Sequence, residues 1–348
     1  MPCLFLLPTS HLLPCSSLTF IELFVSNRKH YRLGDYLFAG LSLLALALSL
    51  IGYLGRLNLY FEFASGYKLQ ILLMALCSAI YFCLTRRRLW IVVSLAVVLI
   101  NLVVILPWYF NRPAIAESNQ YAPLKVFSYN VLWKNKQPKY YQSAIALVEK
   151  EQPDIAIFQE AIPHWHKKLL ALKQSYPYHI YAKKLEIEVY SKLPLLNPEI
   201  KLYGTYRGLV IADLQIGNRQ TKFIATHAYP QLYFGHPGWL IRNEHLEVGI
   251  GEYVGNLEQP AIVIGDLNVS LWSPFYRSMM EKSGLRNARQ GLGVLPTHSI
   301  VAPQFAALSA PIDHCLISPE IQVKDFKLGK AIGSDHRPII ADLLIPKS

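Results

Sequence analysis

The stretch IVIGDLNVS, residues 262–270, places a run of apolar residues directly before Asp266 and Asn268. The run predicts a buried strand, and a buried strand that ends abruptly in an acid and an amide indicates a use for those groups. A single ending of this kind is usually a turn, because Asp and Asn are common turn residues. Whether Asp266 and Asn268 belong to a site therefore depends on partners elsewhere in the chain.

Polar side chains end other predicted strands in the same way. The segments KVFSYN, IAIFQE, KFIATH, APIDH and IGSDHRPI supply Asn130, Gln159, Glu160, Thr226, His227, Asp313, His314, Asp335 and His336. Each residue alone has an ordinary explanation as a turn former or a surface group. Their recurrence in one region favours a shared site, and acids, amides and imidazoles at one rim of a sheet suit a hard cation and general-base chemistry.

The chain from Leu124 onward alternates short apolar strands with amphipathic segments. Strands are predicted over 124–132, 154–160, 208–216, 222–229, 261–268, 312–318 and 338–345, and helices over 140–152 and 239–257. The turn GNRQ at 217–220 joins two of the strands into a hairpin. This mixture predicts an α/β sandwich, in which helices cover packed sheets.

The order of the polar motifs, from NVL and QE through THxxP and GDLN to IDH and SDHRP, resembles the endonuclease/exonuclease/phosphatase superfamily of DNase I-like proteins. The combination of G-D-x-N with a later S-D-H-x-P carries the resemblance, which covers residues 124–346. The resemblance implies a four-layer α/β sandwich and a catalytic domain over 124–348. It also implies hydrolysis of a phosphorus ester or anhydride by in-line attack of water.

The resemblance implies a metal site made of oxygen ligands. Glu160 matches the main Mg²⁺ ligand of the family, Asn130 lies beside it in the motif, and Asp335 is a further metal contact. Mn²⁺ is the alternative ion. Mg²⁺ suits a small set of hard oxygen ligands, since it keeps several waters and binds substrate phosphate.

The resemblance implies catalytic roles for five further residues. Asp266 and Asn268 match the pair that positions and polarises the attacking water, and His227 matches a histidine that stabilises charge on the phosphate. His336 matches the catalytic histidine, and Asp313 matches the acid that orients its ring. Either Asp266 or His336 takes the proton of the water, and the motifs do not decide between them.

Other residues bear on the substrate. Leu132, His298 and Pro311 stand where the abasic-site nucleases of the family commonly have an acid, a Trp and an Arg, which weakens a DNA-repair function without excluding a nonspecific nuclease. Arg207 and Arg242 are candidate phosphate clamps, with an ordinary surface charge as the alternative. The aromatic residues Tyr229, Tyr233, Phe234 and Trp239 either line a pocket, touch a membrane interface or pack a loop onto the sheet.

The first third of the chain has a different composition. Three uncharged apolar runs cover 36–55, 69–85 and 89–110, and about twenty apolar residues span a bilayer as a helix. They predict a membrane domain over 36–110, followed by a polar linker over 111–123. Residues 1–35 precede it as a disordered or interfacial segment, with a fourth span within 1–25 as the alternative.

Positive charges predict the orientation of these helices. Arg28, Lys29 and Arg32 precede the first run, and Arg86, Arg87 and Arg88 separate the second from the third. The positive-inside rule puts these segments in the cytoplasm. With three spans, the catalytic domain then faces the outside of the cell (inner) membrane.

The predicted partners follow from this architecture. Three membrane helices before such a domain resemble the teicoplanin-resistance (VanJ-like) membrane proteins, which implies a lipid-linked phosphate such as a polyprenyl pyrophosphate or a phospholipid. The net charge of +11 suits a polyanion, either nucleic acid or anionic membrane. The alternatives are therefore an extracytoplasmic nuclease acting on DNA or RNA, and an inactive binding module.

Overall fold

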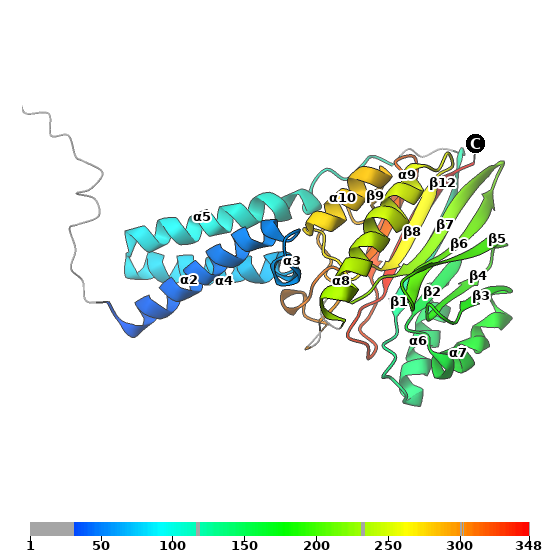
Figure 1. Cartoon of the computed structure of the whole chain (residues 1–348), viewed down its shortest axis with the longest axis horizontal. Helices are drawn as coiled ribbons and strands as arrows, with labels where there is room; N and C mark the ends of the chain where they lie inside the picture. Colours follow the sequence, from blue (N-terminus) through cyan, green and yellow to red (C-terminus); the bar gives the residue numbers. More distant parts are fainter. Residues whose placement is uncertain (1–30, 116–118, 231–233, 300, 302, 348) are drawn as a thin grey trace, which may run out of the picture.

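A bundle of three long helices projects from one end of a two-sheet sandwich (Figure 1). The computed structural model describes residues 31–115, 119–230, 234–299, 301 and 303–347. The expectations for residues 1–30, including a fourth span within 1–25, lie outside the described residues.

The helices of the bundle are α2 (Leu33–Ile51), α4 (Lys68–Thr85) and α5 (Arg88–Ile105). With the 3₁₀ turns Gly52–Leu54 (η1) and Leu106–Tyr109 (η2), they form three stretches long and apolar enough to cross a membrane. The first helix begins at Leu33, a few residues before the predicted start. A short helix that the sequence did not predict, α3 (Leu59–Ser65), lies between the first two and is capped by the Asn58 side chain.

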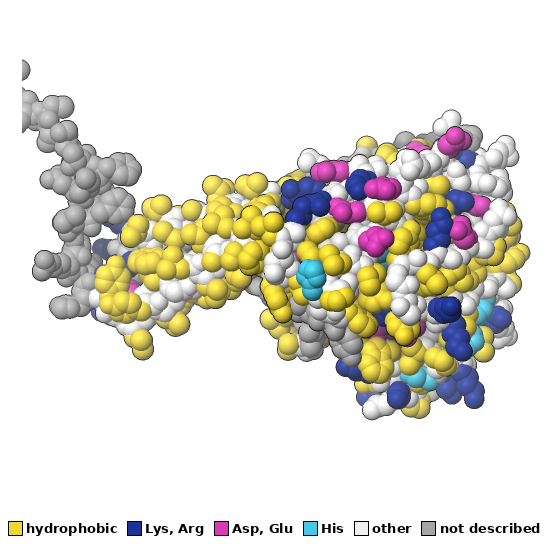
Figure 2. Space-filling model, in the orientation of Figure 1, with side chains coloured by type: hydrophobic (Ala, Val, Ile, Leu, Met, Phe, Trp, Pro, Cys, Tyr) yellow, Lys and Arg dark blue, Asp and Glu magenta, His cyan; other side chains and the backbone are white. Residues whose placement is uncertain are grey.

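Small and polar residues pack the interior of the bundle. The hydroxyls of Ser42 and Ser94 lie 2.9 Å apart, and Nδ2 of Asn101 donates to Oγ of Ser49 at 2.7 Å. Such contacts are typical of helices that pack in lipid, where apolar side chains face outward. Hydrophobic side chains cover the visible face of the bundle, whereas charged side chains gather on the sandwich (Figure 2).

Each sheet of the sandwich has six strands among the described residues. The first has the order β11-β12-β1-β2-β4-β3 and the second the order β5-β6-β7-β8-β10-β9. The strands are β1 (Tyr121–Asn130), β2 (Ile155–Gln159), β3 (Tyr178–Ala182), β4 (Ile187–Ser191), β5 (Leu196–Tyr203), β6 (Arg207–Ile216), β7 (Arg219–His227), β8 (Ala261–Asp266), β9 (Arg286–Asn287), β10 (Asp313–Ile317), β11 (Gln322–Leu328) and β12 (Ile339–Pro346).

Helices cover the outer face of both sheets. The first sheet packs against α6 (Pro138–Glu151), α7 (Pro163–Leu169) and the 3₁₀ turn η3 (Leu170–Gln174). The second packs against α10 (Pro274–Ser283) and one continuous helix made of α8 (Gly235–Glu244), the π-helical η4 (His245–Glu252) and α9 (Tyr253–Gly255). A last 3₁₀ turn, η5 (Ala306–Leu308), precedes β10. The layers run helix, sheet, sheet, helix, which confirms the predicted four-layer α/β sandwich.

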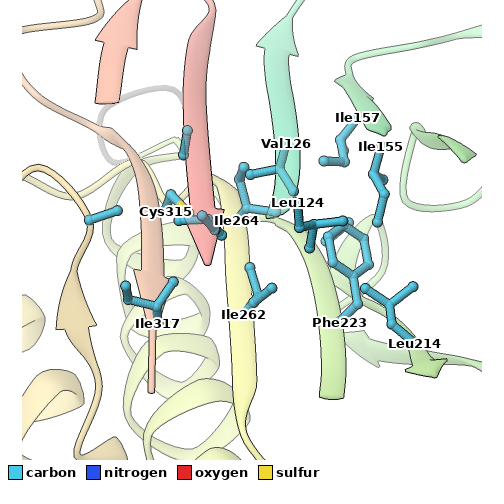
Figure 3. Packing of buried hydrophobic residues seen from close by; sticks show 14 of the residues in the cluster. Leu124, Val126, Ile155, Ile157, Leu214, Phe223, Ile262, Ile264, Cys315 and Ile317 are labelled. Atoms are coloured by element: carbon cyan, nitrogen blue, oxygen red, sulfur yellow. The ribbon is translucent and has the colours of Figure 1, made fainter. Parts of the chain in front are cut away.

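Aliphatic side chains of the two sheets meet in the central core. Val126 and Ile157 of the first sheet face Phe223, Ile262 and Ile264 of the second (Figure 3), and these residues are fully buried or nearly so. The alternating positions of the same strands point to the outer helices. A buried aliphatic side chain stabilises the fold by about 1.5–3 kcal/mol, so this core fixes the positions of the strand ends.

The bundle and the sandwich share contacts around α3 and the end of α5. The side chains of Leu59 and Ile105 belong to a buried hydrophobic cluster that also contains side chains from the helices over the second sheet. Nε1 of Trp272 donates to the Val104 carbonyl at 3.0 Å, and the amide of Gly293 donates to the Trp108 carbonyl at 2.8 Å. The apolar helices are therefore packed against the sandwich.

Candidate active site

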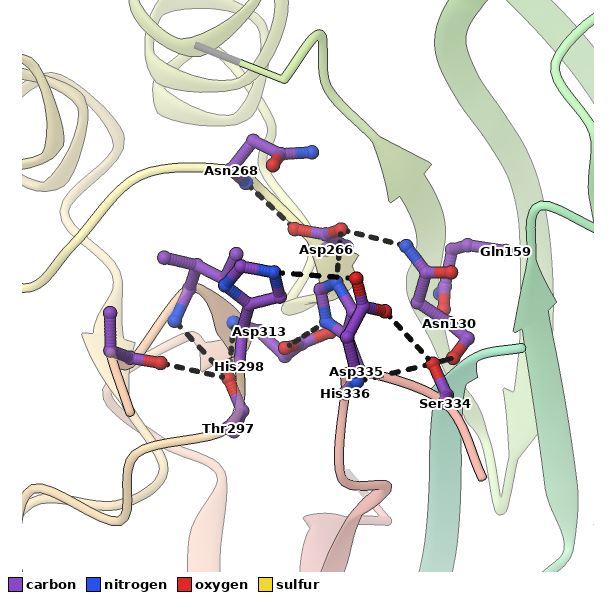
Figure 4. A network of polar contacts seen from close by, with 12 residues as sticks. Asn130, Gln159, Asp266, Asn268, Thr297, His298, Asp313, Ser334, Asp335 and His336 are labelled. Carbon is purple, nitrogen blue, oxygen red and sulfur yellow. Dashed lines mark hydrogen bonds and ion pairs between the residues drawn. The ribbon is translucent and has the colours of Figure 1, made fainter. Parts of the chain in front are cut away.

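The pairing of the strands brings the predicted site residues to one rim. The parallel pairs β1/β2 and β7/β8 place Asn130 opposite Gln159 and His227 opposite Asp266, and the antiparallel pair β8/β10 places Asp313 opposite Asp266. Parallel strands end on the same side, so the polar residues after them converge. Figure 4 shows Asn130, Asp266, Asp313 and His336 gathered at this rim.

Asn130 joins two carboxylates. Its Nδ2 donates to Oε1 of Glu160 at 3.1 Å and to Oδ2 of Asp266 at 3.0 Å, while its Oδ1 accepts from the amide of Leu132. The buried amide therefore holds Glu160 and Asp266 at a fixed separation.

Glu160 adopts a backbone conformation that is rare for its residue type. Its φ is +58°, and Oε2 accepts from the amide of Trp133 at 2.9 Å. A non-glycine residue in the left-handed region costs of the order of 1–3 kcal/mol and is often found at functional sites. This conformation follows β2 directly and turns the carboxylate toward the cleft.

His336 lies among carboxylates. Its Nδ1 pairs with Oδ2 of Asp313 at 2.8 Å, and its Nε2 lies 3.6 Å from Oδ2 of Asp266. Burial lowers the pKa of His336, but Asp313, Asp266 and Asp335 outweigh burial and raise the pKa above its ordinary value. The ring is therefore an imidazolium at neutral pH, and Asp313 fixes its orientation.

The surroundings of Asp266 favour its neutral form, whereas those of His336 favour the charged form. Burial, followed by the charge of Asp313, raises the pKa of this carboxyl, although His336 acts against them. Its Oδ1 accepts from the backbone amide of Asn268 at 2.8 Å, and Nδ2 of Asn268 donates to the Ala228 carbonyl at 3.0 Å. Both residues of the opening stretch thus lie in the cleft with fixed side chains.

Asp335 is paired with His298, a residue that the sequence analysis did not assign to the site. Its Oδ2 lies 3.6 Å from Nε2 of His298, and the rings of His298 and His336 are 4.6 Å apart. Burial raises the pKa of Asp335, but His298 and His336 outweigh burial and lower it to about 2. The only sequence signal for His298 was its place in the segment PTHSI.

His227 lies behind the site. Its Nε2 is 3.7 Å from Oδ2 of Asp266, and its side chain has no exposed surface. Neither ring nitrogen has a hydrogen-bond partner within the described part of the chain. Burial, assisted by the charges of Arg207 and His336, lowers the pKa of His227 well below its ordinary value, so the imidazole is neutral.

The two predicted phosphate clamps differ in position. Arg207 lines the cleft, and its Nη1 donates to Glu186 at 3.2 Å and to the Tyr206 carbonyl at 2.8 Å. Arg242 is fully buried and forms an ion pair with Glu62, so the prediction that it clamps phosphate is wrong. Its amphipathic helix turns it toward the protein interior.

Most of these residues line one cleft of about 740 Å³, whereas Asn130, Asp313 and His227 do not line it. The sandwich supplies one wall, including Glu160, Arg207, Asp266, Asn268, His298, Asp335 and His336. A second wall contains residues 62, 63 and 65–67, which belong to α3 and to the two residues that join α3 to α4. The sequence analysis did not predict that residues between the first two apolar helices reach the site.

The groups at this rim fit a divalent cation. Side-chain atoms of His298, Asp335 and His336 lie within 4.8 Å of one another, as do those of Asp266, Asp313 and His336. The protonated ring of His336 offers no ligand atom, so the carboxylates of these sets are the donors available to an ion. The carboxylates of Asp335 and Glu160 face the same cleft. Hard oxygen donors beside a space large enough for a phosphate suit an ion that keeps part of its water shell.

A family model for the endonuclease/exonuclease/phosphatase family matches residues 127–336. The chain belongs to this family. The match begins within β1 and ends at His336, so it includes the site residues that the sandwich supplies. Members of the endonuclease/exonuclease/phosphatase family are metal-dependent hydrolases of phosphoester bonds, and this protein is an enzyme of that class.

Solved structures of the endonuclease/exonuclease/phosphatase family share the fold at low sequence identity. D. rerio TDP2 in complex with a single-strand DNA product is 17% identical with a TM-score of 0.54, covering 64% of this chain and 99% of its own. A family protein from Bacteroides vulgatus is 19% identical with a TM-score of 0.53, covering 64% and 98%. One from Bacteroides thetaiotaomicron is 18% identical with a TM-score of 0.51, covering 66% and 100%. No curated protein matches this chain.

Proposed function

We propose that this protein is a membrane-anchored, Mg²⁺-dependent phosphohydrolase that cleaves a phosphate ester or pyrophosphate on a lipid. The observation that carries the proposal is the shared cleft, in which Glu160 and His336 face a wall made by residues between two apolar helices. A polyprenyl pyrophosphate and a phospholipid both present a phosphate close to a bilayer. Enzyme and substrate would then share the membrane plane, which raises their effective concentration.

Glu160 and Asp335 would hold the ion, with Asn130 orienting the Glu160 carboxylate. Mg²⁺ is the proposed ion because the donors are hard oxygens, and Mn²⁺ is the alternative. When bound, the ion would neutralise charge on the phosphoryl oxygens. Arg207 lines the same cleft and would add a second positive charge.

Asp266 and Asn268 would position the attacking water. His336 is enclosed by Asp313 and Asp266 and would present an imidazolium N–H to the phosphate. A protonated ring has no free electron pair, so Asp266 would accept the proton of the water. His227 is buried against Asp266. We propose that its neutral ring packs beside the Asp266 carboxylate and does not contact the phosphate.

The site would act on the outer side of the cell (inner) membrane. Arg87 pairs with Asp35 at 2.6 Å. The start of α2 and the junction of α4 with α5, to which these residues belong, lie at the end of the bundle away from the sandwich (Figure 1). The positive-inside rule puts this arginine-rich end in the cytoplasm. Protease added to intact cells should therefore digest the catalytic domain, and protection of that domain until the membrane is opened would contradict the orientation.

The proposed chemistry is tested on the full-length protein in lipid nanodiscs with added Mg²⁺. Substrates are a polyprenyl pyrophosphate, a phospholipid and a soluble phosphodiester. Glu160→Gln and His336→Ala should each lower kcat by roughly 10²–10⁴-fold, since they remove charge stabilisation at the phosphate. The exposed Asp325→Asn on β11 serves as the matched control and should retain activity. Full activity of both site variants would refute the assignment.

A nuclease is the second candidate function. The fold is similar to that of D. rerio TDP2, whose structure contains a single-strand DNA product. Hydrolysis of single-stranded DNA or RNA that falls steeply with added salt, with no activity on the lipid substrates, would favour the nuclease. Absence of Mg²⁺ binding by titration would instead favour an inactive binding module.

A further inference from the structure

The helix α3 and the residues that follow it form part of the active site. Within Leu59–Tyr67, a segment between the first two apolar helices, Glu62, Phe63 and Tyr67 line the cleft opposite the catalytic residues. The family match begins only at residue 127, so this wall comes from outside the matched region. The chemistry proposed above assigns it no role.

A buried carboxylate fixes this segment to the sandwich. Glu62 is 2% exposed and accepts hydrogen bonds from Nε1 of Trp239, Nη2 of Arg242 and Oγ of Ser273. A buried charge is tolerated only when it is paired and hydrogen-bonded, and here all three donors belong to the catalytic half. The wall is therefore held in a defined position relative to the sandwich.

Arg242 and Ser65 also connect this segment to the loop after β8, which carries Asn268. Nη1 of Arg242 donates to the carbonyl of Asn268 at 2.9 Å, and the hydroxyls of Ser65 and Ser270 lie 3.3 Å apart. The loop after β8, which carries Asn268, is thus attached to the segment between the membrane helices. Movement of this segment would change both the wall and the loop.

Aromatic side chains surround the polar floor of the cleft. The rings of Phe63 and Tyr67 lie 4.9 Å apart on the membrane wall. Trp133, Tyr206 and Phe234 line the cleft from the sandwich, and each is at least 40% exposed. Exposed aromatic groups around a charged floor suit an amphiphile that has a phosphate at one end and a hydrocarbon chain at the other.

The loop before β10 adds exposed apolar side chains beside the helical bundle. Nε2 of Gln70, on α4, donates to the Ser309 carbonyl at 3.0 Å and holds the loop before β10 beside the bundle. Phe305 and Leu308 of this loop are 58% and 50% exposed. The hydrocarbon chain would therefore leave the cleft toward apolar surface.

We propose that Phe63 and Tyr67 form the substrate-selecting wall of the active site, and that their rings hold the first part of the hydrocarbon chain of a lipid that carries a phosphate or pyrophosphate. This inference rests on the phosphohydrolase function proposed above. The phosphate would lie between Glu160 and His336, and the chain would pass between the aromatic walls toward the bilayer. Selectivity for a lipid substrate would then come from the membrane segment, whereas the hydrolytic groups come from the sandwich.

The test compares two substrates that share a headgroup and differ in the tail. The full-length protein in nanodiscs is assayed with a long-chain polyprenyl pyrophosphate and with dimethylallyl pyrophosphate. The double variant Phe63→Ala/Tyr67→Ala should raise KM for the long-chain substrate at least about tenfold, as expected for loss of two aromatic contacts. Its kcat/KM for the short substrate should stay within about twofold of the parent value.

Tyr60→Ala is the matched control, because Tyr60 lies on the same short helix, is 70% exposed and does not line the cleft. Tyr60→Ala should leave KM and kcat/KM unchanged for both substrates. Equal losses on both substrates in the double variant, or no loss on either, would overturn the proposed wall. If the parent protein hydrolyses neither pyrophosphate nor a phospholipid with Mg²⁺ present, the proposed function itself fails, which is a distinguishable result.

Discussion

Among the three carboxylates that favour the charged form of His336, Asp313 has the largest effect. The two side chains are buried and lie 2.8 Å apart, and the attraction of the imidazolium lowers the pKa of Asp313 despite its burial. The carboxylate in turn selects the ring orientation, because only Nδ1 can reach it. An uncharged partner of the same shape would keep the packing but would no longer stabilise the charged ring of His336.

We expect Asp313→Asn to lower kcat by roughly 10²–10⁴-fold, as in other histidine–aspartate pairs. The amide lacks the charge that stabilises the imidazolium, so the pKa of His336 is lower in the variant and less of the protonated ring is present. The measurement is steady-state hydrolysis of the phosphorylated substrate, with Asp325→Asn as the control carboxylate. An Asp313→Asn protein with a parent-like kcat would show that the pair has a structural role only.

At the scale of elements, the site depends on close pairing of β7 and β8. Gly265 has a φ of +149°, and a Cβ at this position would lie 1.9 Å from the Thr226 carbonyl oxygen. Only glycine fits there, which explains the residue before Asp266 in the stretch GDLN. The same contact aligns His227 with Asp266.

Gly265→Ala should therefore separate the two strands, lower the free energy of unfolding by about 3 kcal/mol or more, and reduce activity. Gly284→Ala is the matched control, since Gly284 also has a positive φ but no atom within 4 Å of the added Cβ. Its cost should be only about 1–2 kcal/mol. Thermal unfolding of both variants checks the difference, and equal losses would contradict the role given to the strand contact.

The docking of α3 allows a second prediction for an element. Glu62→Ala leaves the guanidinium of Arg242 buried without its carboxylate and should destabilise the junction by about 3–5 kcal/mol. Replacing the pair together, as Glu62→Leu/Arg242→Met, should recover a large part of that loss. Unfolding of the detergent-solubilised protein measures both. A double variant no more stable than Glu62→Ala would show that the pair is not the main contact.

For the whole molecule, buried neutral histidines predict sensitivity to acid. Burial lowers the pKa of His245 to about 3 and that of His314 to about 3. Between this value and the ordinary pKa of 6.5, the unfolded chain binds protons that the folded chain does not. Stability therefore falls as pH drops below 6.5, by about 1.4 kcal/mol for each unit of pKa difference in each group.

We expect the unfolding temperature to decrease steeply between pH 6.5 and pH 4, and His245→Gln to make this decrease shallower. The Gln amide retains a donor for the Thr226 hydroxyl, which contacts His245 at 3.0 Å. The exposed His236→Gln is the control and should leave the slope unchanged. Parallel pH profiles of His245→Gln and the parent would exclude this histidine as a source of acid sensitivity.

The local pattern of the chain determined the sandwich and most of the catalytic rim. Alternating apolar residues predict strands, and polar residues at strand ends predict a rim, because both properties are fixed by neighbours in sequence. This is why Glu160, Asp266 and His336 could be predicted to converge. The three apolar runs likewise predicted the long helices, since hydropathy and length alone decide whether a helix can cross a bilayer.

Only the tertiary structure decided which polar residues face the cleft. Arg242 is buried against Glu62, about 180 positions away in the chain, and His298 reaches Asp335 through a loop with no regular period. The wall made by α3 could not be predicted either, because it depends on how the segment between the first two apolar helices packs against helices far along the chain. Side-chain partners of this kind are set by long-range packing, which a pattern of neighbouring residues does not encode.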